Sequence, residues 1–364
     1  MKIKKISLKN FRNFQKKEVT FFQKNNIVFG QNAVGKTSLL EAIYYSGFTK
    51  SPRTSEINDL IKKDEGFFVV TCDFISENRN KKSILSYSSE GKKIILDLVK
   101  IEKVSDYVGT VGVVYYQPNE IVDFLGTSFN RRKTIDSLFS QISQDYMRSL
   151  KLFNRILKER NSALKSAKNS NFRQSMILIE MLTEKMVQAM KPIIEYRKVF
   201  CDEINNYLAA IHKQFNNQEN LKLEYVPNLN VEVLPSINKD VILKDIQNET
   251  SSFGVHKDDF VFLVNDKEAT RYCSQGQQKS VILSFKLAVT EVFKNHRGEY
   301  PVLLLDDALS ELDKNRQNAL FSVINPEIQM ILSTTSLNEI NKDFLENAKI
   351  IEIKKGEDFD EWRT

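Results

Sequence analysis

Hydrophobic and polar positions alternate at the start of the chain and then change period. Residues 3–8 alternate as in a half-buried strand, and residues 26–29 form a short apolar run that leads into a glycine-rich loop. From Lys36 onward, apolar side chains recur at helical spacing. The order of strand, glycine loop and helix is the one that a phosphate-binding loop requires.

The middle of the chain predicts a sheet followed by long helices. Residues 67–70, 94–96 and 111–115 are β-rich runs separated by turn residues. Between residues 131 and 215 the period is helical, with a polar break at residues 168–171. One helical face of the first helix carries Tyr146, Leu150, Phe153, Leu157 and Leu164, so an antiparallel pair of helices of about 30 residues each is expected.

Strand character returns after the helices. Residues 221–225 and 260–264 are β-rich, and residues 302–305 form a continuous apolar run typical of a buried parallel strand. We therefore predict an α/β fold with a P-loop ATPase core assembled from both chain ends and an inserted, mainly helical lobe. The predicted ranges are 1–125 and 221–364 for the two parts of the core and 126–220 for the helical lobe.

Composition indicates an ordinary globular protein with two local concentrations of positive charge. The 364 residues are 41% hydrophobic, and no run of about 18 apolar residues predicts a membrane span. The three scattered cysteines suggest neither a disulfide framework nor a zinc site, which favours a reducing cytoplasm. Residues 1–50 carry ten Lys or Arg against two acids, and residues 129–173 carry eleven against three, so a polyanionic partner is one interpretation and solvated faces are the other.

The run from Gly30 to Thr37 matches the phosphate-binding pattern G-x-x-x-x-G-K-[ST] in full. Its glycines, including Gly35, let backbone amides curl around phosphates, Lys36 reaches the β- and γ-phosphates, and Thr37 offers a hydroxyl to Mg²⁺. We therefore predict ATP and Mg²⁺ as cofactors, with Asn32 and Ser38 also in the nucleotide site.

The apolar strand at residues 302–305 ends in Asp306 and Asp307. We expect Asp306 to bind Mg²⁺ together with Thr37, and Asp307 to orient or deprotonate the attacking water. A carboxylate at the carboxyl end of a parallel strand points into the cleft where open α/β sheets bind ligands. An acidic turn after a core strand is the alternative.

Ser274 and Gly276 belong to a Ser-Gln-Gly-Gln-Gln run that resembles the signature sequence of ABC-type ATPases, although such a run is often an ordinary turn. The resemblance implies that one subunit's signature approaches the γ-phosphate held by the other subunit. Residues 310–313 resemble the D-loop of the same class, which gives Asp313 a nucleotide-binding role. Gln117 is a candidate for the Q-loop glutamine, or a surface residue. Ser333, Thr334 and Thr335 stand where many ABC ATPases have a histidine, so a hydroxyl would have to sense the γ-phosphate, and Thr334 is our candidate.

Four basic residues repeat along the first long helix at spacings of 3, 4 and 3: Arg148, Lys151, Arg155 and Lys158. They form one stripe opposite the apolar face and are our candidate DNA-binding residues. A merely solvated face explains the stripe equally well.

Nearly the whole chain resembles the RecF family. The resemblance is carried by residues 10–13, 51–55, 131–132, 254–259 and 303–313. It implies a bacterial DNA replication and repair protein with weak, DNA-dependent ATPase activity, which dimerises with ATP on double-stranded, gapped or junction DNA. It also implies a role in recombinational repair and the SOS response. The expected partner proteins are RecR in the first place and RecO in the second. Val255, Lys257 and the Tyr116–Gln117 pair depart from the family pattern. We assign His256 no catalytic role, because a lone histidine is more often structural.

Three other classes of ATP-binding protein fit less well. A transporter ATPase subunit would have its signature about a hundred residues after the glycine loop, whereas the separation here is about 240 residues. A chromosome protein of the SMC type would separate its terminal motifs by a much longer coiled coil. A small-molecule kinase would leave the signature unexplained.

Overall fold

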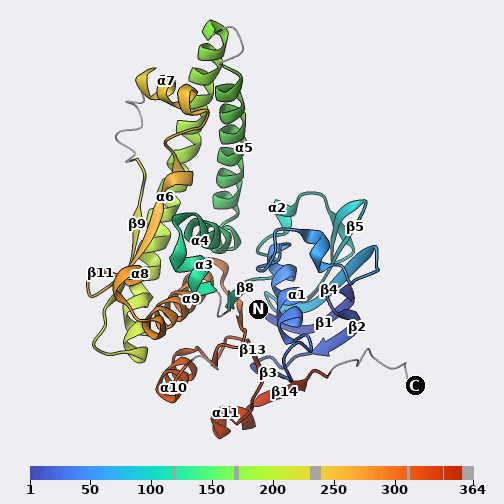
Figure 1. Cartoon of the computed structure of the whole chain (residues 1–364). Helices are drawn as coiled ribbons and strands as arrows, with labels where there is room; N and C mark the ends of the chain where they lie inside the picture. Colours follow the sequence, from blue (N-terminus) through green and yellow to red (C-terminus); the bar gives the residue numbers. More distant parts are fainter. Residues whose placement is uncertain (118–119, 168–171, 230–238, 310–311, 339, 355–364) are drawn as a thin grey trace.

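The computed structural model describes residues 1–117, 120–167, 172–229, 239–309, 312–338 and 340–354 (Figure 1). Its strands are β1 (Lys2–Phe11), β2 (Phe14–Thr20), β3 (Asn25–Phe29), β4 (Phe67–Ser76), β5 (Arg79–Ser88), β6 (Gly91–Leu96), β7 (Val99–Ile101), β8 (Val113–Tyr116), β9 (Leu221–Val226), β10 (Asp259–Val264), β11 (Lys267–Glu268), β12 (Val302–Leu305), β13 (Met330–Thr334) and β14 (Ala348–Glu352). Its helices are α1 (Lys36–Phe48), α2 (Val104–Tyr107), α3 (Glu120–Gly126), α4 (Ser128–Ile142), α5 (Gln144–Ser166), α6 (Phe172–Phe215), α7 (Lys239–Asn248), α8 (Ala269–Tyr272), α9 (Gln275–Arg297), α10 (Lys314–Val323) and α11 (Lys342–Glu346), with short 3₁₀ turns η1 (Ile57–Leu60) and η3 (Val255–Lys257).

A parallel sheet joins the two ends of the chain. Its strand order is β14-β3-β13-β12-β8, and every neighbouring pair is parallel. Strands β8, β12 and β13 are buried at every position, as expected when both faces of a parallel sheet are covered. Because β3 lies between two C-terminal strands, the prediction of an α/β core assembled from both chain ends is confirmed.

A second, antiparallel sheet covers α1 on its other side. Its order is β2-β1-β4-β5-β6-β7, and β4 buries every second residue, which is the pattern of a strand with one face on the core. Helix α1 packs against β13 and β8 of the parallel sheet and against β1 and β4 of the antiparallel one. The helix that follows the glycine loop is therefore held between two sheets.

The long helices form a projecting hairpin. Helices α5 and α6 lie side by side and point away from the sheets (Figure 1). Helix α5 has 23 residues and α6 has 44, so α6 is longer than predicted and spans about 66 Å. The predicted apolar face is confirmed: Tyr146, Phe153 and Leu164 are buried, and Leu150 and Leu157 are half-buried. The predicted polar break at 168–171 lies outside the described residues.

Residues beyond 220 also pack on the long helices. The third sheet, β11-β10-β9, packs on α6 through β9, helix α7 packs on α5, and α9 lies along α6. The three predicted ranges remain a proposal. This packing favours grouping residues 221–297 with the helical lobe, because β9 and α9 pack on α6 and α7 packs on α5.

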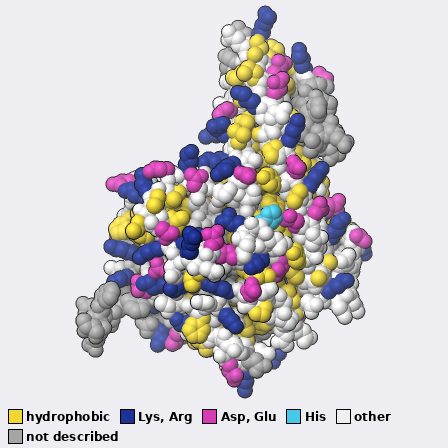
Figure 2. Space-filling model, turned by 180° about the vertical axis from the view of Figure 1, so that it is seen from behind, with side chains coloured by type: hydrophobic (Ala, Val, Ile, Leu, Met, Phe, Trp, Pro, Cys, Tyr) yellow, Lys and Arg dark blue, Asp and Glu magenta, His cyan; other side chains and the backbone are white. Residues whose placement is uncertain are grey.

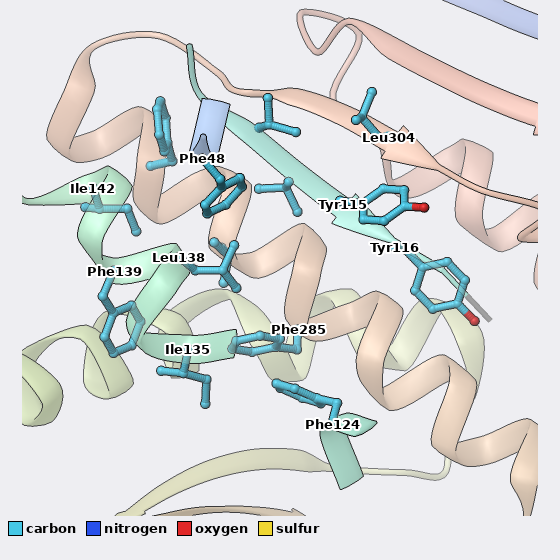
Figure 3. Close-up of a cluster of buried hydrophobic side chains, with 14 of the residues drawn as sticks. Phe48, Tyr115, Tyr116, Phe124, Ile135, Leu138, Phe139, Ile142, Phe285 and Leu304 are labelled. Atoms are coloured by element: carbon cyan, nitrogen blue, oxygen red, sulfur yellow. The ribbon is translucent and has the colours of Figure 1, made fainter. Parts of the chain in front are cut away.

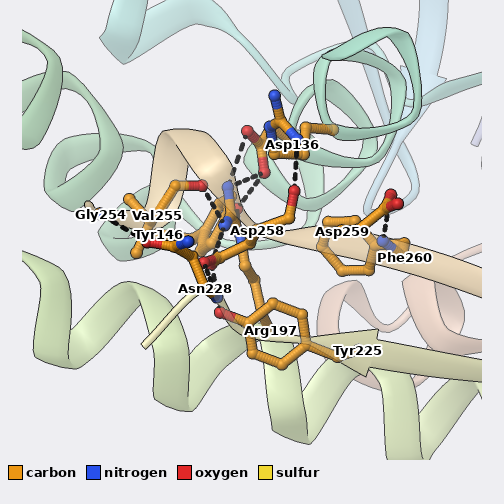
Figure 4. A network of polar contacts seen from close by, with 11 residues as sticks. Asp136, Tyr146, Arg197, Tyr225, Asn228, Gly254, Val255, Asp258, Asp259 and Phe260 are labelled. Atoms are coloured by element: carbon orange, nitrogen blue, oxygen red, sulfur yellow. Dashed lines mark hydrogen bonds and ion pairs between the residues drawn. The ribbon is translucent and has the colours of Figure 1, made fainter. Parts of the chain in front are cut away.

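A buried ionic network fastens this lobe together (Figure 4). The Arg197 guanidinium of α6 donates to Asp258 (2.6 Å) and Asp136 (2.9 Å), and its Nε donates to the Tyr146 hydroxyl at 3.1 Å. Tyr225 also donates to Asp258, at 2.5 Å. Removing one partner would leave a buried charge uncompensated, so the network ties α4, α5, α6 and β9 to the η3–β10 turn.

An aromatic core connects the helical lobe with the parallel sheet (Figure 3). The rings of Phe124 from α3 and Phe285 from α9 lie 5.3 Å apart, and Phe139 from α4 is fully buried nearby. Tyr115 and Tyr116 of β8 lie along the same cluster. The signature-bearing helix α9 is thus packed between the lobe and β8.

Candidate functional site

The glycine loop joins β3 to α1, and two of its glycines are required by their surroundings. Gly35 has φ +114°, and a Cβ there would lie 2.6 Å from the Phe14 ring. A Cβ on Gly30 would lie 2.4 Å from the carbonyl oxygen of Ile353. The loop can therefore curl tightly against β14 and the β1–β2 turn only with glycine at both positions.

Lys36 occupies the interior of this loop. It is 5% exposed, and its Nζ donates to the carbonyl oxygens of Gly30 at 2.8 Å and Gln31 at 2.9 Å. Burial lowers the pKa of Lys36, although the nearby carboxylates of Asp307 and Asp306 oppose the shift. The ammonium group is therefore held inside the loop, where phosphates would bind.

Asp306, at the end of β12, accepts hydrogen bonds from three hydroxyl groups. Thr37 Oγ1 donates to Oδ1 at 3.2 Å, Ser333 Oγ donates to the same oxygen at 2.5 Å, and the Tyr115 hydroxyl donates to Oδ2 at 3.0 Å. Burial and the adjacent Asp306 charge raise the pKa of Tyr115 far above its usual value. Tyr115 therefore remains a neutral donor that fixes the carboxylate beside Thr37.

Asp307 adopts a left-handed backbone with φ +47°, which is rare for a residue other than glycine. Its N–H donates to Ser333 Oγ at 3.0 Å. The turn directs Asp307 into the same pocket as Lys36, whereas Asp306 remains against Thr37. The two adjacent carboxylates consequently face different surroundings, as their different predicted roles require.

The pocket beside the loop has a volume of about 590 Å³. The loop and helix residues Asn32, Gly35, Lys36, Thr37 and Ser38 line it together with Asp307. Their roles in binding and hydrolysing the nucleotide stay predictions.

Two arginines in this pocket were given no role by the sequence analysis. Arg12 donates to the buried Glu41 at 2.7 and 2.9 Å and to the Asp59 carbonyl at 2.7 Å. Arg53 lines the same pocket, and its Nη1 lies 3.6 Å from Glu41. Both lie in segments that carry the family resemblance, residues 10–13 and 51–55, and this was the one feature of the sequence that could have pointed to them. Only the fold shows that these segments meet at the glycine loop.

The signature residues lie outside the described lining of this pocket. Ser274 is exposed and caps α9: its Oγ accepts the Gln277 N–H at 3.3 Å, and the Gln277 side chain accepts the Ser274 N–H at 2.8 Å. A Cβ on Gly276 would lie 2.4 Å from Arg316 Nη1, so glycine there leaves room for that guanidinium. The signature thus forms an exposed helix start next to an arginine.

The remaining predicted nucleotide residues are also outside that lining. Gln117 follows β8, next to the carboxyl end of β12, and is half-exposed. Asp313 caps α10 by accepting the Arg316 N–H at 2.9 Å, while Ser310 and Glu311 of the predicted D-loop lie outside the described residues. The Thr334 hydroxyl donates to the Ser336 carbonyl at 3.0 Å, whereas its neighbour Ser333 contacts both aspartates.

The predicted DNA stripe on α5 is exposed along its whole length. Arg148, Lys151, Arg155 and Lys158 all face solvent, with Arg148 3.3 Å from Asp145 and Arg155 3.9 Å from Glu159. Figure 2 shows that basic and acidic side chains are interspersed on the face it displays, and that hydrophobic side chains reach the surface of the projecting lobe.

The described residues form neither a membrane-spanning helix nor a cluster of metal-binding side chains. No helix among them has the length and apolar character needed to cross a membrane. The same residues contain no group of three or more His, Cys, Asp or Glu side chains suited to a metal ion.

Known proteins resemble this chain along its length. The profile described as RecF/RecN/SMC N terminal domain matches residues 2–358. A relative from Oceanobacillus iheyensis, named DNA replication and repair protein RecF, is 33% identical over 367 residues, covering 98% of this chain and 99% of the relative. A relative of the same name from Oenococcus oeni is 34% identical over 370 residues, with 98% and 99% coverage.

Solved structures give the same result. A structure described as the recombination mediator protein RecF with ATP in the RecFOR pathway has a TM-score of 0.85, 30% identity and 93% coverage of each chain. The Smc head domain of Pyrococcus furiosus has a TM-score of 0.57 at 18% identity, covering 98% of this chain and 94% of that one, which is a likeness of fold alone. The chain belongs to the RecF family of DNA replication and repair proteins, within the wider group of RecF, RecN and SMC ATP-binding domains.

Proposed function

We propose that this protein binds ATP with Mg²⁺ and uses the nucleotide to close a homodimer on DNA, with slow, DNA-dependent hydrolysis reopening it. The observation that carries the proposal is the convergence of Lys36, Thr37 and Asp306 from opposite chain ends, with Thr37 Oγ1 3.2 Å from Asp306. The RecF relative with ATP supports the choice of nucleotide.

The donor atoms beside the loop suit Mg²⁺. This ion is usually held by one or two carboxylates plus substrate phosphates rather than by a cage of protein ligands. Asp306 and the Thr37 hydroxyl supply one carboxylate and one hydroxyl at adjoining positions. Bound Mg²⁺ would neutralise charge on the phosphates, while Lys36 binds them and Asp307 orients the attacking water.

The exposed signature supports assembly in trans. Ser274 and Gly276 do not line the described pocket of their own chain, and the start of α9, although capped by Ser274 and Gln277, is the positive end of a helix dipole and favours an anion. In a two-fold dimer each signature can cover its partner's ATP, which makes two equivalent sites.

The cellular role is proposed from the RecF relatives. We assign this chain to recombinational repair at DNA gaps and to the SOS response in the cytoplasm, with DNA, RecR and secondly RecO as partners. The relatives' shared name and the RecFOR pathway of the solved homologue support this assignment.

Mixing two inactive variants tests the assembly. Lys36→Ala removes the cation that binds the phosphates, and Ser274→Arg blocks the closed interface while leaving the glycine loop intact. Each variant alone should hydrolyse ATP poorly, and Ser274→Arg should still bind ATP but remain monomeric in sedimentation velocity. A mixed dimer should recover one working site, built from the intact loop of one chain and the intact signature of the other.

Two outcomes would contradict the proposed dimer in which each signature covers its partner's ATP. One is ATP-dependent dimerisation of Ser274→Arg, and the other is a mixture with no more ATPase activity than its separate components. Ser89→Arg, at an exposed serine in the turn between β5 and β6, is the control for adding a cation. It should dimerise with ATP as the unchanged chain does.

A further inference from the structure

A second and larger cleft, of about 840 Å³, lies between the sheets and the helical lobe. We call it the inter-lobe cleft. Phe48 and Lys50 at the end of α1, together with α2, form one wall. Residues of α4, α5 and η3 form the other. It shares no lining residue with the pocket beside the glycine loop.

Four lysines from remote parts of the chain surround this cleft: Lys50, Lys133, Lys151 and Lys257. All four are exposed, and none forms an ion pair with a residue that the structure describes. Asp136 is the one acid in the described lining, and Arg197 already binds it at 2.9 Å. The cleft therefore carries a surplus of positive charge and favours an anionic ligand.

The same cleft is largely apolar inside. Phe129 is 65% exposed at its edge, and Leu150 and Leu157 of α5 are half-buried along its wall. The His256 ring lies 5.9 Å from the Phe153 ring, and burial lowers the pKa of His256 to about 4. His256 is consequently neutral at pH 7 and adds a flat, uncharged surface.

We propose that the inter-lobe cleft binds an unpaired segment of DNA, with a base stacked on Phe129 and phosphates beside the four lysines. This inference rests on the proposed DNA-binding function and names the form of DNA that one site takes. A basic groove with exposed aromatic rings is the usual arrangement for single strands. In a duplex the faces of the bases are hidden in the stack, so only unpaired bases can use an apolar wall.

Phe129→Ala in the full chain tests the stacking contact. Fluorescence anisotropy with ATP and Mg²⁺ would compare a labelled oligothymidine with a blunt duplex of equal length. Loss of the stacking contact with one base should weaken single-strand binding roughly 5- to 150-fold. Duplex binding should change less than about twofold, and Phe129→Trp should restore single-strand affinity. Phe22→Ala, which removes a 57% exposed ring elsewhere, should leave both affinities unchanged.

Removing charge from both walls tests the lysines. The double variant Lys50→Gln with Lys133→Gln should bind single strands with a weaker salt dependence. The slope of log binding constant against log salt concentration should fall in magnitude by about 1.4, since each phosphate contact contributes about 0.7. The control pair Lys63→Gln with Lys222→Gln removes two exposed lysines that do not line the cleft. This pair should leave the slope unchanged.

The outcomes separate this inference from the proposed function. If the unchanged protein binds no DNA, the DNA-binding function itself fails. If it binds DNA but Phe129→Ala leaves single-strand affinity unchanged, or weakens duplex and single strand equally, only the cleft proposal fails. A competition experiment with an acidic amphipathic peptide tests for a protein ligand instead. The cleft proposal is overturned if this peptide displaces the labelled oligonucleotide at a lower concentration than unlabelled oligothymidine does, and if it no longer does so from the Phe129→Ala variant.

Discussion

Single hydroxyl groups organise the charges around the glycine loop. Ser333 Oγ contacts Asp306 Oδ1 at 2.5 Å and accepts the Asp307 N–H at 3.0 Å, so one side chain holds both aspartates. Thr334, the predicted γ-phosphate sensor in this segment, instead donates its hydroxyl to the Ser336 carbonyl. The Thr334 role remains a prediction, and Ser333 is the residue with direct contacts to the carboxylates.

Asp307→Asn should separate nucleotide binding from hydrolysis. The amide keeps the size of the side chain but cannot act as a base, whereas Asp306 and Lys36 keep their contacts. We expect ATP affinity within about threefold of the unchanged chain and turnover lower by roughly 10²- to 10⁴-fold in steady-state assays. Asp59→Asn, in the same pocket, is the control and should hydrolyse ATP normally. Normal turnover by Asp307→Asn would move the catalytic carboxylate elsewhere.

Helix α5 combines a buried apolar face with a basic, exposed one. Tyr146 and Phe153 are fully buried against the lobe, while the predicted DNA stripe remains in solvent. Of that stripe, Lys151 also lines the inter-lobe cleft, and Arg155 and Lys158 do not. These two residues therefore test the outer surface of α5 separately from the cleft.

Reversing the charges of Arg155 and Lys158 together should weaken duplex binding. Two lost phosphate contacts would reduce the log–log salt slope by about 1.8, because each contact with B-DNA contributes about 0.9. Anisotropy titrations from 50 to 200 mM salt would measure the slope. Lys63→Glu with Lys222→Glu is the matched control. An unaltered slope in Arg155→Glu with Lys158→Glu would mean that the stripe is only a solvated face.

The helical lobe and the parallel sheet meet where α9 packs on β8. A Cβ on Gly112, just before β8, would lie 2.3 Å from the Phe293 ring of α9. Both sides of this contact are buried, so a methyl group at Gly112 would have to displace the ring within a packed core. Gly112 therefore sets the distance between the sheet that carries Asp306 and the helix that carries Ser274.

Gly112→Ala should loosen this junction. Overpacking of this kind costs about 1–3 kcal/mol of unfolding free energy, which differential scanning calorimetry would register as a lower Tm. ATP-dependent dimerisation and hydrolysis should fall more than ATP binding, because the glycine loop is not touched. Gly66→Ala has no neighbour within 4 Å of its new Cβ and is the control. Equal Tm values for the two variants would contradict a tight junction at Gly112.

The sequence by itself determined the features that depend on neighbours along the chain. The glycine loop, the Asp306–Asp307 strand end and the apolar face of α5 follow from local spacing, since strand and helix periods place nearby residues in fixed relations. Contacts between residues far apart in the chain leave no such regular spacing in the sequence. The tertiary structure alone therefore decided that Tyr115 and Ser333 would hold Asp306, that Arg316 would lie against Gly276, and that four distant lysines would surround one apolar cleft.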